Sequence, residues 1–143
     1  MDFLSVALYV LSWILSLIFL RAGLVKVTSR LFSKDHKETR QEFAQYATVC
    51  PTMLFGITPS PDGYMLLVGV IETLSSILLL VPDTDLHTWM YLIFCVMLAL
   101  SIYTHDVLEQ YFKMVYDICL FLAFIVLYKV GPIALTNQEN DLE

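Results

Sequence analysis

The chain has 143 residues, of which 58% are hydrophobic and 15% are charged, and its formal net charge is −6. Soluble domains are about 45–50% apolar, and here the excess is concentrated in four long runs, so the composition predicts one integral membrane domain. No basic cluster with interleaved aromatic residues occurs, which argues against nucleic-acid binding. The three cysteines lack C-x-x-C spacing, which argues against a dithiol redox enzyme and against a disulfide framework.

The first apolar run predicts a membrane span over about residues 3–25. It has no basic segment before it and no small-residue cleavage site, so we expect a retained anchor rather than a signal peptide. Small and polar residues repeat along one side of this span, and this side is expected to meet the acid of the second span. Lys26 lies near the extension of this side, whereas Arg21 points away from it but lies nearer the midplane. Either cation could pair with that acid.

Residues 28–63 form the only long polar loop, and its first half is dense in charge. The spacing of Phe43, Tyr46 and Cys50 predicts an amphipathic helix over about residues 34–49, lying on the membrane or over the bundle. Prolines then end this helix and lead the chain to the second span. We predict that Phe43 and Tyr46 bind a partner, with burial against the protein's own bundle as the alternative.

The second span, residues 64–81, carries a single carboxylate, Glu72, at its centre. Eighteen helical residues reach about 27 Å, so Glu72 lies near the bilayer midplane. An ionisable group there costs about 2.5–3.5 kcal/mol. Gly69, Thr73 and Ser76 share its face, and small or hydroxyl side chains allow another helix to approach and satisfy a buried carboxyl group. We therefore predict that Glu72 is buried between helices, either as a packing contact or as a functional group.

Two further spans are predicted over about residues 87–104 and 111–129, joined to their neighbours by short turns. Asp117 lies four residues after Lys113, which predicts a helical ion pair. An Asp-x-Asp-x-His pattern begins at residue 83, but a helix N-cap explains it better than a metal, so we expect neither metal nor cofactor. The acidic tail, residues 133–143, is expected to be disordered.

The sequence thus predicts an all-α membrane protein with a four-transmembrane-helix bundle over residues 1–132 and an amphipathic helix in the first loop. Four spans place both termini on one side of the membrane. Seven of the eight Lys and Arg residues then lie on the other side. The positive-inside rule therefore predicts a cytoplasmic first loop and termini that are lumenal or outside the cell.

Common catalytic motifs are missing: the sequence contains no G-x-S-x-G, HExxH, Walker or GxGxxG pattern. Glu72, His105 and Asp117 come from three different spans and could suggest a proton path or a metal–carboxylate site. However, the helical rise places His105 roughly 13 Å from the level of Glu72, too far for shared ligation. We expect no enzymatic activity, and an ion or proton conduit through Glu72 stays an alternative.

Several short segments carry a resemblance to a known family. In order and spacing, GLVK (23–26), EFAQYATVCP (42–51) and FGITPSP (55–61), followed by Tyr64, Gly69, Glu72 and His105, resemble the DoxX-like four-helix membrane family. The likeness is greatest to its animal branch, that of the acetylcholine-receptor chaperone NACHO and its smaller sister protein, and it covers roughly residues 19–129. Two features differ from the expected pattern: Ser76 replaces a glycine, and an acidic stub replaces a long basic tail.

The resemblance implies a multi-pass protein of the endoplasmic reticulum membrane, in contact with membrane lipid. It also implies a chaperone or auxiliary subunit that helps pentameric ligand-gated channel subunits of the acetylcholine-receptor type to assemble, and that could accompany the receptor to the plasma membrane. Bacterial members of the family are associated with quinone-linked or redox-linked systems. A redox-linked membrane protein is therefore the alternative from a different functional class.

Overall fold

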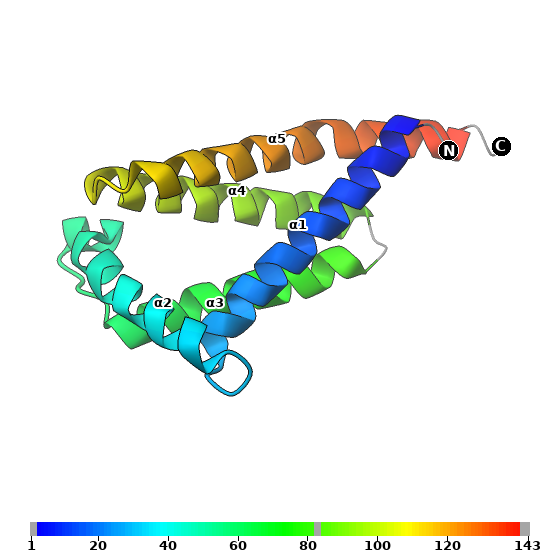
Figure 1. Cartoon of the computed structure of the whole chain (residues 1–143). Coiled ribbons are helices and arrows are strands. Elements are labelled where there is room, and N and C mark those ends of the chain that lie inside the picture. Colours follow the sequence, from blue (N-terminus) through cyan, green and yellow to red (C-terminus); the bar gives the residue numbers. More distant parts are fainter. Residues whose placement is uncertain (1–2, 82–83, 141–143) are drawn as a thin grey trace.

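Figure 1 shows the computed structural model, which describes residues 3–81 and 84–140. Within these ranges the chain forms helices joined by turns, and four of the helices are long and apolar enough to cross a membrane. The predicted all-α, four-helix membrane fold is therefore confirmed. The elements are α1 (Phe3–Val27), α2 (Ser33–Tyr46), the 3₁₀ turns η1 (Ala47–Val49) and η2 (Pro51–Phe55), α3 (Pro61–Leu80), α4 (Thr84–Val107) and α5 (Tyr111–Asn140).

Helix α3 begins three residues earlier than predicted because its start is well capped. The side chain of Ser60 accepts a hydrogen bond from the backbone N–H of Gly63, 3.1 Å away. Pro61 follows at the first helical position, where the missing N–H costs nothing and the fixed φ suits a helix. The start of the second span is therefore determined by local sequence.

Helix α5 ends later than predicted. Residues 133–140, expected to belong to a disordered tail, are helical, and residues 141–143 lie outside the described part of the chain. The expected stop at Pro132 does not occur, because a proline removes one backbone hydrogen bond and bends a helix without always ending it. The membrane-spanning part of α5 is Tyr111–Gly131.

The four long helices are arranged as two antiparallel pairs. Helix α1 packs mainly along α3, and α4 packs mainly along α5, with fewer contacts between the pairs. The start of α1 and the end of α5 lie at one end of the molecule, whereas α2 and the α4–α5 turn lie at the other (Figure 1). This arrangement is the one that an even number of spans requires.

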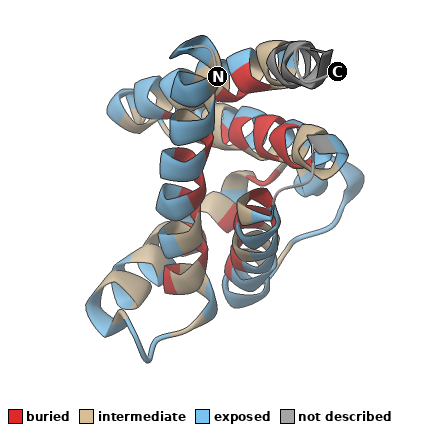
Figure 2. Cartoon of the chain, turned by 90° about the vertical axis from the view of Figure 1, so that its right-hand side faces the viewer, coloured by how far each residue is buried: buried red, intermediate tan, exposed pale blue. Residues whose placement is uncertain are grey.

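Aromatic side chains form the core between the two pairs. The ring of Phe19 on α1 lies 4.7 Å from that of Phe94 on α4 and 5.6 Å from that of Phe124 on α5, measured between centroids. In Figure 2 the buried residues lie on the helix sides that face one another. Large apolar side chains of all four long helices face outward, as a bundle surrounded by lipid requires, among them Trp13, Leu67, Val96 and Leu122.

Candidate functional site

Two glycines bring α1 and α3 into close contact. A Cβ atom added to Gly69 would lie 3.1 Å from the backbone oxygen of Gly23, and one added to Gly23 would lie 2.8 Å from the backbone nitrogen of Thr73. Neither position has room for a larger side chain. The small face predicted around Glu72 therefore lies against the small residues at the end of α1.

Lys26 and Glu72 form an ion pair at this contact. The Nζ atom of Lys26 donates to the Oε2 atom of Glu72 over 2.7 Å and also to the backbone oxygen of Ala22 over 3.3 Å. Glu72 is only 7% exposed. Side chains on a helix point toward its N-terminus, so the ammonium of Lys26 lies about one turn before its own Cα, beside Glu72.

Arg21, the other candidate partner of Glu72, lies on the outside of α1. Its guanidinium donates to the carboxylate of Asp35 on α2 over 2.9 Å and lies over the ring of Phe32. The choice between the two cations follows from helical spacing. Lys26 follows Gly23 by three residues and shares its face, just as Glu72 follows Gly69 by three residues on α3.

The hydroxyl groups near Glu72 do not bind its carboxylate. Ser76 donates to the backbone oxygen of Glu72 over 2.6 Å, and Ser16 on α1 donates to the backbone oxygen of Ser76 over 2.7 Å. Thr73 Oγ1 is buried with no hydrogen-bond partner in the described part of the chain. The expectation that hydroxyls satisfy the carboxyl group is corrected here, because the ammonium of Lys26 takes that role.

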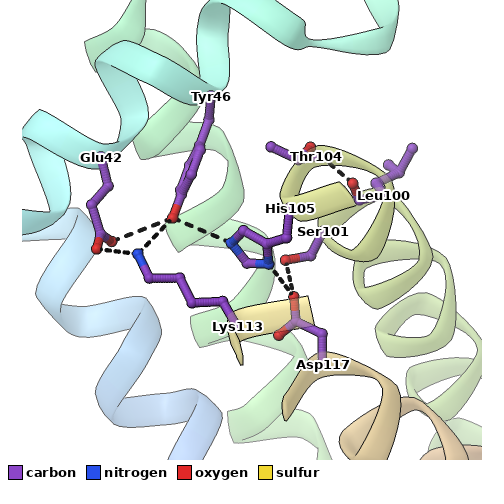
Figure 3. A network of polar contacts seen from close by, with 8 residues as sticks. All are labelled: Glu42, Tyr46, Leu100, Ser101, Thr104, His105, Lys113 and Asp117. Carbon is purple, nitrogen blue, oxygen red and sulfur yellow. Dashed lines mark hydrogen bonds and ion pairs between the residues drawn. The ribbon is translucent and has the colours of Figure 1, made fainter. Parts of the chain in front are cut away.

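A second polar cluster joins α2, α4 and α5 (Figure 3). The carboxylate oxygen Oδ2 of Asp117 lies 2.7 Å from Nδ1 of His105 and accepts a hydrogen bond of 2.6 Å from the hydroxyl of Ser101. His105 and Asp117 are both buried. On its other side, His105 Nε2 lies 3.3 Å from the hydroxyl of Tyr46. The carboxylate therefore orients the imidazole toward α2.

Lys113 completes this cluster at its outer edge. Its Nζ atom lies 2.5 Å from a carboxylate oxygen of Glu42 and 3.4 Å from the hydroxyl of Tyr46. The predicted pair of Lys113 with Asp117 is wrong, because each has a partner on another helix. Burial, reinforced by the negative charge of Glu42, raises the pKa of Tyr46 above its ordinary value, so this hydroxyl stays protonated at neutral pH.

Helix α2 makes a polar contact with each of the four long helices. It therefore braces both helix pairs at one end of the molecule. The contacting pairs are Asp35 with Arg21 of α1, Arg40 with Asp62 of α3, Tyr46 with His105 of α4, and Glu42 with Lys113 of α5.

Phe43 holds α2 against the bundle from inside. Its side chain is 5% exposed, and its ring centroid lies 5.2 Å from those of both Tyr46 and Tyr64, in edge-on contacts. The sequence left two alternatives for Phe43, and this burial matches packing on the protein's own bundle. The ring of Phe43 is thus not offered to a partner in this conformation, and Tyr46 is half-buried in the second cluster.

Glu72, His105 and Asp117 do not form one site. Glu72 belongs to the α1–α3 contact, and the other two belong to the α2–α4–α5 cluster. In the described ranges no three His, Cys, Asp or Glu side chains are placed to hold a metal ion, and Asp83 of the Asp-x-Asp-x-His pattern lies outside those ranges.

Sequence reasoning missed the roles of Glu42, Ser101 and Lys113. The only local signal was the spacing of Glu42 and Tyr46, which places both on one face of α2. Lys113 is 71 residues from Glu42, so no helical period relates them.

Compared with known families, the chain matches no protein-family model.

Proposed function

We propose that this protein is a non-enzymatic membrane chaperone or auxiliary subunit. Its clients would be pentameric ligand-gated channel subunits of the acetylcholine-receptor type, which it would help to assemble in the endoplasmic reticulum membrane. The proposal rests on the four helices that could cross a membrane together with the resemblance of the short segments to the DoxX-like family.

One observation carries the proposal: the segments that bear the resemblance meet one another in the fold. Lys26 of the GLVK segment pairs with Glu72, and Tyr46 of the EFAQYATVCP segment contacts His105. These contacts give the matching segments structural roles, at the α1–α3 interface and between α2 and α4. These contacts support the resemblance to the DoxX-like family, and with it the proposed chaperone role of the animal branch.

Two pairs of buried polar side chains inside the bundle are partnered within the chain itself. Lys26 is paired with Glu72, and His105 with Asp117, each over 2.7 Å. Such a bundle is compatible with lipid on its outer faces before any client arrives. A client span would then pack on an apolar outer face and displace lipid, since helix association in membranes relies on close packing rather than on hydrophobic burial.

The test is co-expression with acetylcholine-receptor subunits in cells that lack this protein. We expect the chain to increase the number of assembled receptors at the cell surface, measured with a ligand that binds only assembled pentamers. We also expect it to co-purify with unassembled subunits from the endoplasmic reticulum. The negative control is Glu72→Lys, which places two cations side by side within the membrane and should prevent folding.

Two results would contradict the proposal. One is an unchanged number of surface receptors at a level of wild-type protein that is confirmed by immunoblot. The other is an increase in receptors that Glu72→Lys also produces at equal abundance, because a response independent of the buried pair would not depend on this fold.

A further inference from the structure

The loop between α2 and α3 changes its character at residue 47. Helix α2 is rich in charged residues, whereas residues 47–61 contain no Asp, Glu, Lys or Arg. Within this uncharged stretch, apolar side chains point outward: Leu54 is 80% exposed, Phe55 83% and Ile57 60%. Exposed apolar patches of this kind are typical of surfaces that contact a membrane or another protein. The tip is therefore expected to lie in an apolar environment.

The backbone of this tip is largely satisfied by its own hydrogen bonds. The N–H of Ile57 donates to the oxygen of Thr52 over 3.2 Å, and the hydroxyl of Thr52 donates back to the oxygen of Ile57 over 3.1 Å. The N–H of Gly56 donates to the oxygen of Met53 over 3.1 Å. Irregular backbone enters lipid only when its polar groups are paired, and this turn meets much of that requirement.

Gly56 makes the turn possible. Its φ of +75° lies in the left-handed region, and a Cβ added there would have no atom within 4 Å. Gly56 is therefore needed for the left-handed backbone conformation of the turn and not for close packing. As a result, the turn projects Leu54 and Phe55 away from the rest of the protein.

The turn lies at the end of the molecule where two candidate membrane spans begin. Ile57 precedes the start of the α3 span by four residues, and the α5 span starts at Tyr111. Phe112, next to that start, is 90% exposed. The loop between α2 and α3 lies at the same end of the molecule as the α4–α5 turn (Figure 1), and Gln110 of that turn donates a hydrogen bond to Gln45 near the end of α2.

We propose that residues 53–57 are a membrane anchor that inserts into the interfacial region of the bilayer. Lipid is the occupant because the tip is uncharged, its backbone is largely paired internally, and it lies at the end of the molecule where the candidate spans of α3 and α5 begin. The anchor would fix the depth of α2 and keep its charged face in water. The inference does not depend on the proposed function.

Tryptophan fluorescence in reconstituted vesicles tests the anchor. The native Trp13 and Trp89 are replaced by Phe, and Phe55→Trp introduces a single reporter. The matched control is Gln41→Trp, on the exposed face of α2. The protein is placed in phosphatidylcholine vesicles whose acyl chains are brominated near the headgroup, and iodide is added separately as an aqueous quencher. Circular dichroism verifies that both variants keep their helix content.

We expect brominated lipid to quench the Phe55→Trp variant strongly and the Gln41→Trp variant weakly, with the opposite order for iodide. Equal iodide quenching of the two variants, with no effect of brominated lipid on Phe55→Trp, would overturn the proposal. Protection of the Phe55→Trp reporter from both quenchers would also overturn it, because the tip would then contact a second copy of the chain. Leu54→Trp provides an independent reporter and should reproduce the result for Phe55→Trp.

Discussion

At the scale of single residues, the Lys26–Glu72 pair has the largest consequences. The 2.7 Å contact lies in the α1–α3 interface, where neither group can reach water easily. Removing one member of a buried pair leaves an uncompensated charge and costs about 3–5 kcal/mol, whereas replacing both by apolar residues is often neutral. The effect on stability of a substitution at one of these positions therefore depends strongly on the residue at the other.

Glu72→Leu and Lys26→Met should each destabilise the purified protein, by about 3–5 kcal/mol. The double variant with Lys26→Met and Glu72→Leu should lose much less than the sum of the single losses. Unfolding in detergent, followed by circular dichroism, measures all of these variants. Additive losses would show that the two side chains do not interact in the folded protein.

Gly69→Ala should also destabilise the protein. The added methyl would contact the Cβ of Lys26 and lie 3.1 Å from the oxygen of Gly23, so α1 and α3 must separate. Gly131→Ala is the matched control, because its nearest neighbour is a Tyr91 atom 3.9 Å away. We expect a lower melting temperature for Gly69→Ala alone, and equal melting temperatures for both variants would refute the close α1–α3 contact.

At the scale of elements, α2 adds polar contacts at one end of the molecule to the aromatic core that joins the two helix pairs. Its exposed ion pairs contribute little individually, because water and salt screen the attraction between surface charges. The buried ring of Phe43 contributes more, since burial of an aromatic side chain dominates such interfaces. We therefore expect Phe43, rather than the ion pairs, to determine whether α2 stays docked.

Phe43→Ala should cost about 3–5 kcal/mol and lower the amount of protein in the membrane. Phe112→Ala, at an exposed position of α5, removes the same ring from a site outside the core and should leave abundance unchanged. Immunoblots of membrane fractions compare the two variants. Normal abundance of Phe43→Ala combined with loss of receptor co-purification would instead support direct partner docking at Phe43.

At the scale of the whole molecule, the distribution of basic residues and the arrangement of the helices indicate the same orientation in the membrane. The start of α1 and the end of α5 lie at one end of the bundle, and α2, with most of the basic residues of the first loop, lies at the other (Figure 1). The positive-inside rule therefore predicts that α2 lies in the cytoplasm. This orientation also places the proposed anchor in the cytoplasmic leaflet.

A glycosylation acceptor tests this orientation. Added after residue 143, it should be modified in microsomes, because the C-terminus is expected in the lumen. The same acceptor inserted between α1 and α2 should stay unmodified. Modification of the loop acceptor, with an unmodified tail, would reverse the orientation and move the anchor to the lumenal leaflet.

The four-helix fold could be predicted because long apolar runs identify spans without knowledge of their packing. The face around Glu72 could also be predicted, because Gly69, Thr73 and Ser76 follow one helical period. The partners of Lys113 and Asp117 could not, since local spacing favours an i, i+4 pair whereas the fold supplies Glu42 and His105 from other helices. The packing of one helix against another determines such contacts, and no local pattern in a single sequence reveals that packing.

Affinity purification of the chain from native membranes tests the central claim most directly. We expect subunits of pentameric ligand-gated channels among the proteins that are recovered, identified by mass spectrometry, with less recovery by the Glu72→Lys variant, which should not fold. An absorption spectrum and metal analysis of the same sample test the redox-linked alternative. A stoichiometric quinone, chromophore or metal without any channel subunit would contradict the chaperone function.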